Sequence, residues 1–597
     1  MYILGISGHH RDAAAALIQD GRIVAAIEEE KLARIKNIGI RQCGGLPYQA
    51  IGHCLEAAGI GIDAVDYVAY YLKPRRLLGR QLKFGETALV ENISAAEDHS
   101  AASLNEFHDR TQTLHLIRRL IGGRSKALAV DHQLAHAAGA FYLSGFDRAA
   151  ILVLSGNEDY VSISMGVGEG RKIRLRERIE FPHSPGWIYS LVTEYLGFQP
   201  NGGEHNTQWL SLSGEPEFLP AFRNFLRIDS EGLPSVDLSY LSTSHHAADP
   251  FSEKFYHEFG DVLRRKDTRF KNGVKSTSWT ELIGDLSGRP KTAPPATSYR
   301  RNLAHSLQQR LEEVVLGLAE KLRKEHGIDN LCLAGGVAFN SLLVSRLERE
   351  SGFKSIFVPP AAGNAGCSVG GALFQWHHQL DQGQPEALSH AYLGPEYSDH
   401  EVKPVIDNCK LAYRYLPTED RLLDEIVALL HRGMIVAWFQ GRAEFGPRSL
   451  GARSILASPL QAFIKDNLNL FVKHRESSRP FAASVPEERA EEFFDNCTPL
   501  SRFLLTVSRV KPEKQRLIPA AWFSNGMARV HTVNRRTNPL FWQLLNKFEE
   551  KTGVPILLNT SFNLFGEPVV CTPREAVRSF YCSGIDALAI NRFLLQK

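Results

Sequence analysis

The chain of 597 residues is too long for one hydrophobic core, and at roughly 150 residues per domain it should form two to four domains. Its composition is typical of soluble globular proteins, and a formal net charge of +3 is too small at this length to indicate nucleic-acid or membrane binding. The eight cysteines contain no C-x-x-C pair, which argues against a disulfide framework or a cysteine zinc site. No apolar run approaches the roughly 20 residues that cross a bilayer, and the N-terminus lacks the basic start of a signal peptide, so we expect a cytoplasmic protein.

Two segments of the N-terminal half predict the same arrangement of strands. Residues 2–6, 13–18 and 22–27 are apolar, and the turn Gln19-Asp20-Gly21 is typical of a β-hairpin. The pattern recurs over residues 149–154 and 160–167, where residues 168–170 form the turn. The repetition suggests a duplicated ribonuclease-H-like architecture, in which paired turns face a nucleotide across a cleft.

The segment between these repeats contains a histidine pair. Residues 44–58 and 109–121 have the pattern of helices, and His132 and His136 follow. Four residues apart on a helix, both imidazoles point to one side and could share a metal ion. Packing or surface exposure is the competing interpretation.

The middle of the chain gives fewer signals. Residues 215–295 are rich in Ser, His, Asp and Pro and predict an irregular insertion, whereas residues 299–326 predict a long amphipathic helix. Residues 330–340 read as a strand that runs into the Gly335-Gly336 turn and a helix. That turn would let a nucleotide approach the backbone, or it is simply a tight connection. Residues 379–398 predict an interdomain linker.

A basic loop follows the strand predicted at residues 434–439. Its cations are Arg442, Arg448, Arg453, Lys473, Arg475 and Arg479. Glycines and Pro447 break the local structure, and apolar residues interleave with the cations, so the charges should lie in a packed segment and need partners. A solvated charged face is the alternative, but the pattern favours an anion pocket, because guanidinium groups bind phosphate bidentately and lysine acts as a point charge.

Neutral hydrogen-bonding side chains follow near the C-terminus. After a helix predicted over Pro539–Thr552, a strand from residue 554 ends in Asn559, Thr560, Ser561 and Asn563. Such groups orient a carbonyl or amide, although a polar turn would have the same composition.

Seven stretches of the chain form a recognisable set: DHQLAHAA, YLGFQPN, LCLAGGVAFN, WFQGRAEFGPRSLGARSIL, VKHRESSRPFAASV, ARVHTV and GVPILLNTSFNLFGEPVVCTP. Taken together, they resemble the NodU/CmcH/TobZ family of O-carbamoyltransferases of antibiotic and nodulation-factor biosynthesis. They occur in the expected order over essentially the whole chain, which chance does not explain well. The resemblance implies an α/β protein with a TsaD-like domain of the actin-like ATPase (ASKHA) type at residues 1–378, the linker at 379–398, and a YrdC-like α/β domain at 399–597.

By the same resemblance, the YrdC-like domain makes carbamoyl adenylate from carbamoyl phosphate and ATP with Mg²⁺. The TsaD-like domain then transfers the carbamoyl group to a small-molecule hydroxyl, with a bound metal ion such as Fe²⁺. Arg448, Lys473, Arg479, Arg529 and Ser561 fall on positions that hold the phosphates and the adenylate. His132 and His136 fall on metal ligands. We assign Arg442, Arg475, Asn559, Thr560, Asn563, Gly335 and Gly336 to substrate or nucleotide binding.

The departures from the family pattern lie almost entirely in the N-terminal half. Ser155 and Asn364 stand where relatives have carboxylates, Asn206 replaces a lysine and Arg11 a histidine. Two imidazoles without a carboxylate should bind a divalent ion more weakly or differently. We therefore expect an intact adenylate-forming half and a modified transfer half, whose acceptor is a hydroxyl or a nitrogen. The alternatives are an enzyme that only forms the adenylate and, least favoured, a non-catalytic nucleic-acid-binding protein. The oligomeric state, with a homodimer as one option, stays open.

Overall fold

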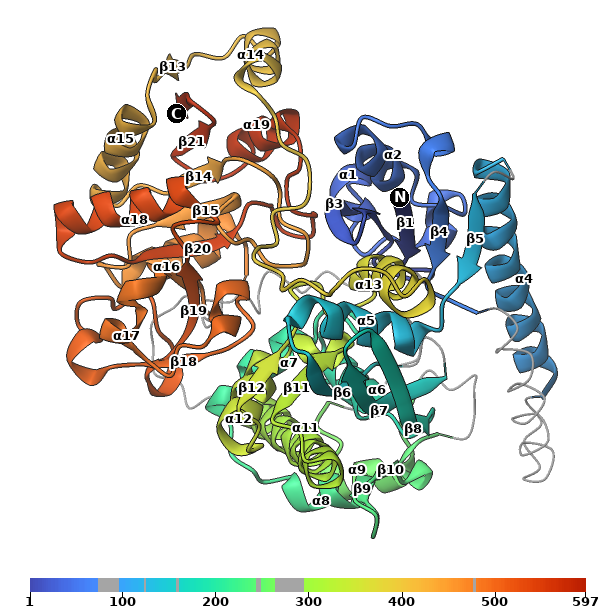
Figure 1. The fold of residues 1–597 in the computed structure, drawn as a ribbon. Coiled ribbons are helices and arrows are strands. Elements are labelled where there is room, and N and C mark those ends of the chain that lie inside the picture. The colour runs from blue at the N-terminus through green and yellow to red at the C-terminus, as the bar shows by residue number, and fades with distance from the viewer. Residues whose placement is uncertain (74–95, 123–124, 157–159, 243–248, 264–294, 476–478) are drawn as a thin grey trace. The chain divides into compact units, whose positions relative to one another are not determined.

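The computed structural model describes residues 1–73, 96–122, 125–156, 160–242, 249–263, 295–475 and 479–597. The chain divides into two compact units. The first combines Met1–Pro182 with Leu318–Lys597, and the second is His183–Gly317. Figure 1 shows the elements of both units by label and by colour along the chain.

Two five-stranded sheets in the first unit share one topology. One has the order β3-β2-β1-β4-β5 and the other β12-β11-β6-β7-β8. In each, three antiparallel strands are followed by two strands parallel to the first. Their bounds are β1 Tyr2–Ser7, β2 Ala14–Gln19, β3 Arg22–Glu28, β4 Tyr67–Tyr70, β5 Lys126–Ala129, β6 Arg148–Leu154, β7 Val161–Glu169, β8 Lys172–Glu180, β11 Asn330–Ala334 and β12 Ser355–Phe357. The duplicated ribonuclease-H-like architecture is thereby confirmed.

The first hairpin shows why the sequence specified it. Asp20 and Gly21 have φ of 50° and 85°, the double left-handed conformation of a type I′ turn, which matches the twist of the flanking strands. The helix predicted at 44–58 is shorter, α2 at Tyr48–Ala57, because Pro47 immediately before it has a non-helical backbone, with φ of −79° and ψ of 74°. The helix predicted at 109–121 is longer, α4 at Ala96–Leu120.

Where residues 215–295 were predicted to be irregular, the second unit has helices and a hairpin between residues 219 and 259, while residues 243–248 and 264–294 of that segment lie outside the described residues. The described part of the second unit contains α6 Pro185–Tyr195, α7 Glu204–Leu210, α8 Leu219–Phe225, the hairpin of β9 Leu226–Ile228 with β10 Pro234–Val236, and α9 Glu253–Phe259. Phe225, Phe255 and Phe259 form a buried aromatic core, with Phe255 and Phe259 ring centroids 4.5 Å apart. Elements this short carry too little periodicity to be recognised in sequence. Helix α11, Pro295–His326, crosses the boundary between the units.

The C-terminal part of the first unit is built on a ten-stranded sheet of order β13-β22-β21-β14-β15-β20-β16-β19-β18-β17. The central strands are β14 Val436–Phe439, β15 Arg453–Ala457, β16 Ala482–Pro486, β19 Met527–Val533, β20 Leu557–Ser561 and β21 Ala587–Ile590, and the outer ones are β13 Arg414–Tyr415, β17 Phe494–Asp495, β18 Ser508–Val510 and β22 Phe593–Gln596. Helices α15 (Glu419–His431) and α18 (Pro539–Thr552) pack beside each other over one face of this sheet (Figure 1). A second apolar cluster covers the opposite face.

The segment predicted as a linker, residues 379–398, is mostly exposed up to residue 389 and is buried at Ala391 and over 393–395, and it is held at several points by backbone hydrogen bonds. The N–H of Leu388 donates to the carbonyl of Leu143 at 2.9 Å, and the carbonyl of Leu393 accepts from Ala26 of β3 at 3.1 Å. Gly394 N–H donates to Ala443 of the basic loop at 2.9 Å. The segment thus joins the two parts of the first unit by backbone hydrogen bonds, while its role as a domain boundary stays a prediction.

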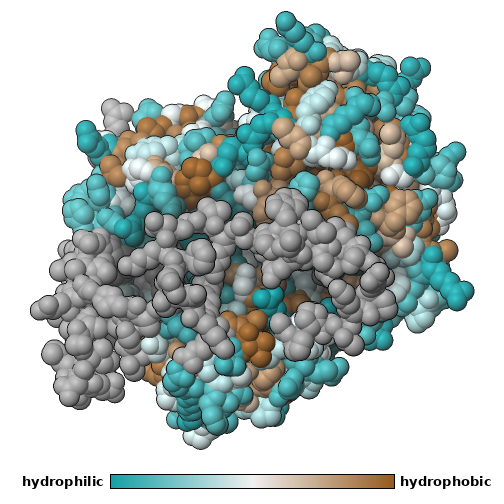
Figure 2. Space-filling model, turned by 180° about the vertical axis from the view of Figure 1, so that it is seen from behind, coloured by the Kyte–Doolittle hydropathy of each residue, from teal (hydrophilic) through white to brown (hydrophobic). Residues whose placement is uncertain are grey.

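The surface carries hydrophilic residues interspersed with small hydrophobic areas on the face that Figure 2 shows. Within the described ranges, every helix is too short or too polar to span a membrane.

Candidate active site

The basic loop is organised from within by one carboxylate. Glu444 is 3% exposed, and its Oε1 accepts hydrogen bonds from the backbone N–H groups of Leu450, Ala452 and Arg453 at 2.7, 2.9 and 3.2 Å. A carboxylate that accepts three N–H bonds fixes the turn between β14 and β15. The two strands then pair from Val436 to Phe439.

Two arginines of the loop are structural anchors. Arg442 donates to the carbonyls of Leu393, Gly394 and Val24 at 2.7, 3.1 and 3.0 Å. The side chain of Arg453 is fully buried, donates to three carbonyls and lies 3.6 Å over the ring of Phe439. We predicted that Arg442 binds substrate or nucleotide. In the structure its guanidinium instead donates hydrogen bonds to backbone carbonyls of residues far from it in sequence.

Other cations of the C-terminal half lie close together, and their charges lower the pKa values of their neighbours. Burial, followed by the charge of Arg479, lowers the pKa of Arg448 to about 10. Burial and then Arg448, Arg479 and Arg475 bring the pKa of Arg529 well below its ordinary value. The pKa of Lys473 falls likewise, through burial and then Arg475, Arg479 and Lys36.

Burial and the neighbouring cations named above all lower these three pKa values. Like charges held together in a buried site are stable only when an anion compensates them. We call Arg448, Lys473, Arg475, Arg479 and Arg529 the cation cluster. Such an arrangement is chemically suited to binding a polyanion.

Strand register places Arg529 beside neutral polar groups. Arg529 of β19 is opposite Ala482 of β16, and Ala482 is opposite Asn559 of β20. Residues in register point to the same face, so Arg529 and Asn559 share one face of the sheet, as do Ser484 and His531 two residues further along their strands. Thr560, which we also predicted as a binding residue, points to the other face, where it pairs with Ile455.

Asn559 has one polar atom to offer a ligand. Its Nδ2 donates to the Ser449 carbonyl and to Ser484 Oγ, both at 3.2 Å, whereas Oδ1 is buried without a partner in the described structure. Ser449 Oγ and Arg448 Nε are also buried without a hydrogen-bond partner among the described residues. One acceptor, one hydroxyl and one cationic donor therefore stand ready, a set that suits a carbamoyl group next to a phosphate.

Lys473 is held by the end of β20. Its Nζ donates to Ser561 O at 2.5 Å, to Asn563 O at 3.0 Å and to Asn563 Oδ1 at 2.8 Å. Ser561 Oγ donates to Asn563 Oδ1 at 2.7 Å. The structure thus brings together Lys473, Ser561 and Asn563, which were predicted as site residues from separate motifs.

Sequence reasoning missed two polar residues of this face. Ser484 Oγ and His531 Nδ1 are 2.9 Å apart, and burial lowers the pKa of His531 to about 3, so its ring is neutral. The alternation of Arg529 and His531 in a strand could have identified His531, because residues two apart share a face.

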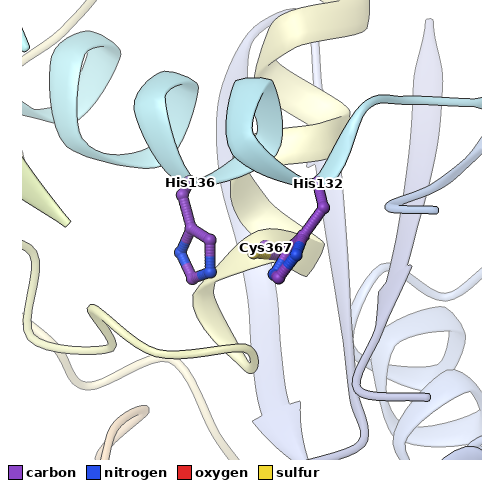
Figure 3. A group of neighbouring side chains, drawn as sticks. All are labelled: His132, His136 and Cys367. Carbon is purple, nitrogen blue, oxygen red and sulfur yellow. The ribbon is translucent and has the colours of Figure 1, made fainter. Parts of the chain in front are cut away.

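The predicted histidine pair lies on α5, His132–Ser144, which Asp131 caps through the N–H of Leu134 at 3.1 Å. The two rings point to the same side of the helix, with centroids 4.7 Å apart, and Cys367 of α13 (Gly366–Leu373) lies beside them (Figure 3). The side-chain oxygen of Asn364 is 3.3 Å from His132 Nε2. Burial and then His132 bring the pKa of His136 well below its ordinary value, so this imidazole is neutral, as a metal ligand must be.

The remaining predicted residues of the N-terminal half occupy different places. Ser155 Oγ accepts from Gln133 Nε2 at 3.0 Å and donates to the Val161 carbonyl at 2.9 Å. Gly335 has φ of 92° and approaches the Leu154 carbonyl so closely that a Cβ would lie 2.1 Å from it, whereas Gly336 faces open space. Glu158 and Asp159, which could have replaced Ser155 as carboxylates, lie outside the described residues.

Arg11 and Asn206 mark the two other departures from the family pattern. Arg11 is half-buried beyond β1 of the first unit, and Asn206 lies on α7 of the second unit, where its N–H donates to the carbonyl of Gly203 at 2.8 Å.

Comparisons with known proteins identify the family to which the chain belongs. Residues 2–373 match the family described as Carbamoyltransferase N-terminus, and residues 427–597 match Carbamoyltransferase C-terminus. Nodulation protein NolNO of Sinorhizobium fredii is 33% identical over 98% of this chain and 79% of its own length. Nodulation protein U of Rhizobium tropici is 32% identical over 95% and 91% of the two chains, and an uncharacterized protein of Synechocystis is 35% identical over 100% and 97%. The chain therefore belongs to the carbamoyltransferase family that includes the NodU and NolO nodulation proteins.

Proposed function

We propose that this carbamoyltransferase activates its carbamoyl group with ATP in the cation cluster. Carbamoyl phosphate is cleaved by water to carbamate and inorganic phosphate, and carbamate displaces pyrophosphate from ATP to give carbamoyl adenylate. The group then passes to a small-molecule acceptor, with release of AMP. The observation that carries the proposal is the cluster itself, in which burial and the nearby charge of Arg479 lower the pKa of Arg448, of Lys473 and of Arg529.

Each residue has a distinct part in this proposal. Arg448 and Arg529 neutralise charge that builds on the phosphates in the transition state, and Lys473 is fixed by the β20 carbonyls as a point charge. Asn559 Oδ1 accepts an N–H of the carbamoyl amide, which distinguishes this group from acetate or bicarbonate. Mg²⁺ accompanies ATP as it does in most adenylate-forming reactions.

Transfer is assigned to the site around His132 and His136. A divalent ion held there would polarise the carbamoyl carbonyl and lower the pKa of the acceptor hydroxyl. His136 is neutral and in contact with the Ala362 carbonyl and with Asn364, so it is poised to act as a ligand rather than as a cation.

The test is ATP–pyrophosphate exchange that depends on carbamoyl phosphate. Arg529→Met should lower exchange by about two to three orders of magnitude, as loss of one transition-state donor does elsewhere. The matched control is Arg414→Met, which removes a surface arginine paired with Glu425 and should leave exchange unchanged. Absence of exchange in the wild-type protein, with carbamoyl phosphate and Mg²⁺ present, contradicts the proposal.

A second candidate function is adenylate formation with a repurposed transfer half. The observation in its favour is that an amide, Asn364, approaches His132 where relatives have a carboxylate. The two functions differ in one measurement. A transferase should consume carbamoyl adenylate faster when candidate alcohols or amines are added, whereas the repurposed enzyme should release AMP at the same rate with and without them.

A further inference from the structure

Three side chains in the N-terminal half form a group whose donor set differs from the carboxylate-containing site that the family resemblance implies. The ligand atoms of His132, His136 and Cys367 all lie within 4.8 Å of one another, and no carboxylate of the described residues belongs to the group. The three side chains are 1%, 3% and 0% exposed. Figure 3 shows both imidazoles projecting from α5 toward the side on which Cys367 lies.

Close packing of α5 against α13 brings the thiol to the imidazoles. A Cβ on Gly370 would lie 1.9 Å from the Ala135 carbonyl, and one on Gly139 would meet the Gly366 carbonyl at 3.5 Å. The two backbones can approach this closely only because residue 370 is glycine, whereas the contact at Gly139 is an ordinary van der Waals distance. Cys367 is one helical turn before Gly370, and His136 is one residue after Ala135, so the contact places thiol and imidazole in register.

The chemistry of these donors suits a borderline or soft ion. Hard ions such as Mg²⁺ and Mn²⁺ take carboxylate and water oxygens, whereas a thiolate with imidazoles is typical of Zn²⁺. His136 Nε2 is buried and has no hydrogen-bond partner among the described residues, so one lone pair is available. A divalent ion therefore fits this group, and the thiol decides which ion fits best.

We propose that His132, His136 and Cys367 form a zinc site in which Cys367 supplies the negative ligand that Asn364 no longer provides. The thiol loses its proton when the Zn–S bond forms, so one proton is released per ion bound. Three protein ligands leave a fourth position for water or for the Asn364 side-chain oxygen, which is the pattern of catalytic zinc sites.

The geometry needs only a small contraction. A tetrahedral zinc ion with bonds of about 2.0–2.3 Å separates its ligand atoms by roughly 3.3–3.7 Å. The present spread of up to 4.8 Å closes to that range when each side chain moves by about an ångström or less. Rotation about χ angles supplies such movements without displacing either helix.

Sulfur ligation is the decisive readout, because almost any site of nitrogen ligands prefers Zn²⁺ over Fe²⁺ or Mn²⁺. The purified full-length protein is loaded with one equivalent of Zn²⁺, and X-ray absorption at the zinc edge should show one sulfur at about 2.3 Å. A shell of nitrogen and oxygen alone would overturn the proposal. This measurement needs no variant, so a folding defect cannot obscure it.

Variants then assign the sulfur. The cobalt-loaded protein should show an ultraviolet thiolate-to-cobalt charge-transfer band, which Cys367→Ser abolishes. Cys409→Ser and Cys582→Ser, which remove exposed thiols that could bind metal adventitiously, should retain it. A band that survives Cys367→Ser, or that disappears in the exposed-thiol variants, contradicts the assignment.

Asn364→Asp tests the exchange of ligands directly. A carboxylate beside His132 restores a hard donor, so the ratio of bound Fe²⁺ to Zn²⁺ under competition should rise at least severalfold, and an unchanged ratio opposes the proposal. Because these assays contain no carbamoyl phosphate or ATP, they test the zinc site independently of the proposed carbamoyl transfer.

Discussion

A buried ion pair ties the basic loop to the N-terminal sheet, and its loss should loosen the loop by a predictable amount. Lys31 of α1 (Glu29–Ala33) is 3% exposed and pairs with Glu28 Oε2 at 2.8 Å. Its Nζ also donates to the carbonyls of Glu444 and Gly446 at 2.7 and 2.9 Å, and Glu28 Oε1 accepts from Gly446 N–H at 2.7 Å. The perturbation is Lys31→Met, which keeps the length of the side chain and removes its charge.

The expected loss of local stability follows from the groups that Lys31→Met leaves buried without a partner. Removing one partner of a buried pair costs about 3–5 kcal/mol, because the other charge stays buried. Two carbonyls also lose a charged donor, which favours the upper part of that range. Since 1.36 kcal/mol corresponds to a factor of ten, the amides of residues 444–453 should exchange with solvent at least about a hundredfold faster.

Hydrogen exchange is the assay of choice, because it reports on the loop itself even when a chain of two compact units does not unfold in one two-state transition. In the double variant Glu28→Gln/Lys31→Met, the neutral amide can still accept from Gly446, so protection should return in part, with a coupling of about 1–3 kcal/mol. The control Lys403→Met removes a surface pair with Asp407 and should leave exchange unchanged. Additive effects of the two single variants would refute the coupling.

Three further outcomes can be checked by simple measurements. Burial lowers the pKa of His531 from 6.5 to about 3, so the folded protein binds fewer protons than the unfolded chain between these pH values. This contribution to the free energy of unfolding, roughly 5 kcal/mol, is present above pH 6.5 and is lost as the pH falls toward 3. His531→Gln should therefore make stability fall less steeply with acid, and an unchanged pH dependence argues against a neutral buried imidazole. Gly370→Ala forces a Cβ to within 1.9 Å of the Ala135 carbonyl and should reduce both stability and zinc affinity, whereas Gly317→Ala, where nothing lies within 4 Å, should do neither. Inorganic pyrophosphate at a hundred times its dissociation constant should stabilise the protein by about 2.7 kcal/mol, seen as a rise in Tm that Arg448→Met abolishes; equal shifts in both proteins would place the anion elsewhere.

The sequence predicted those parts of the fold that depend on local pattern. The Asp20-Gly21 turn and the alternating strands on either side specify the first hairpin, and the recurrence of that pattern predicted the second sheet. Lys473 was predicted from its motif as well. The Cys367 thiol escaped prediction because only the approach of α5 to α13, through glycines distant in sequence, brings it to the histidines.

The roles of individual arginines were equally hidden in the sequence. Arg442, Arg448 and Arg453 occur in one short motif and read as equivalent, but their roles depend on which carbonyls and charges surround them in three dimensions. Arg442 and Arg453 each meet carbonyls of several segments, including residues 393–395, which the sequence predicted as a linker. Arg448 instead meets other cations.

This division of arginines predicts two different kinds of inactive variant. Arg453 donates to the carbonyls of Gln440, Ala452 and Pro395, so Arg453→Met leaves buried acceptors without donors and should destabilise the protein by about 3 kcal/mol or more in the absence of any ligand. Arg448→Met removes a cation that its neighbours repel, so the unliganded protein should keep its stability or gain some, while binding of pyrophosphate weakens. Both variants should lose ATP–pyrophosphate exchange, but only the first should lower Tm without ligand. If Arg448→Met were the more destabilising of the two, mutual repulsion could not be the property that makes this loop a receptor for anions.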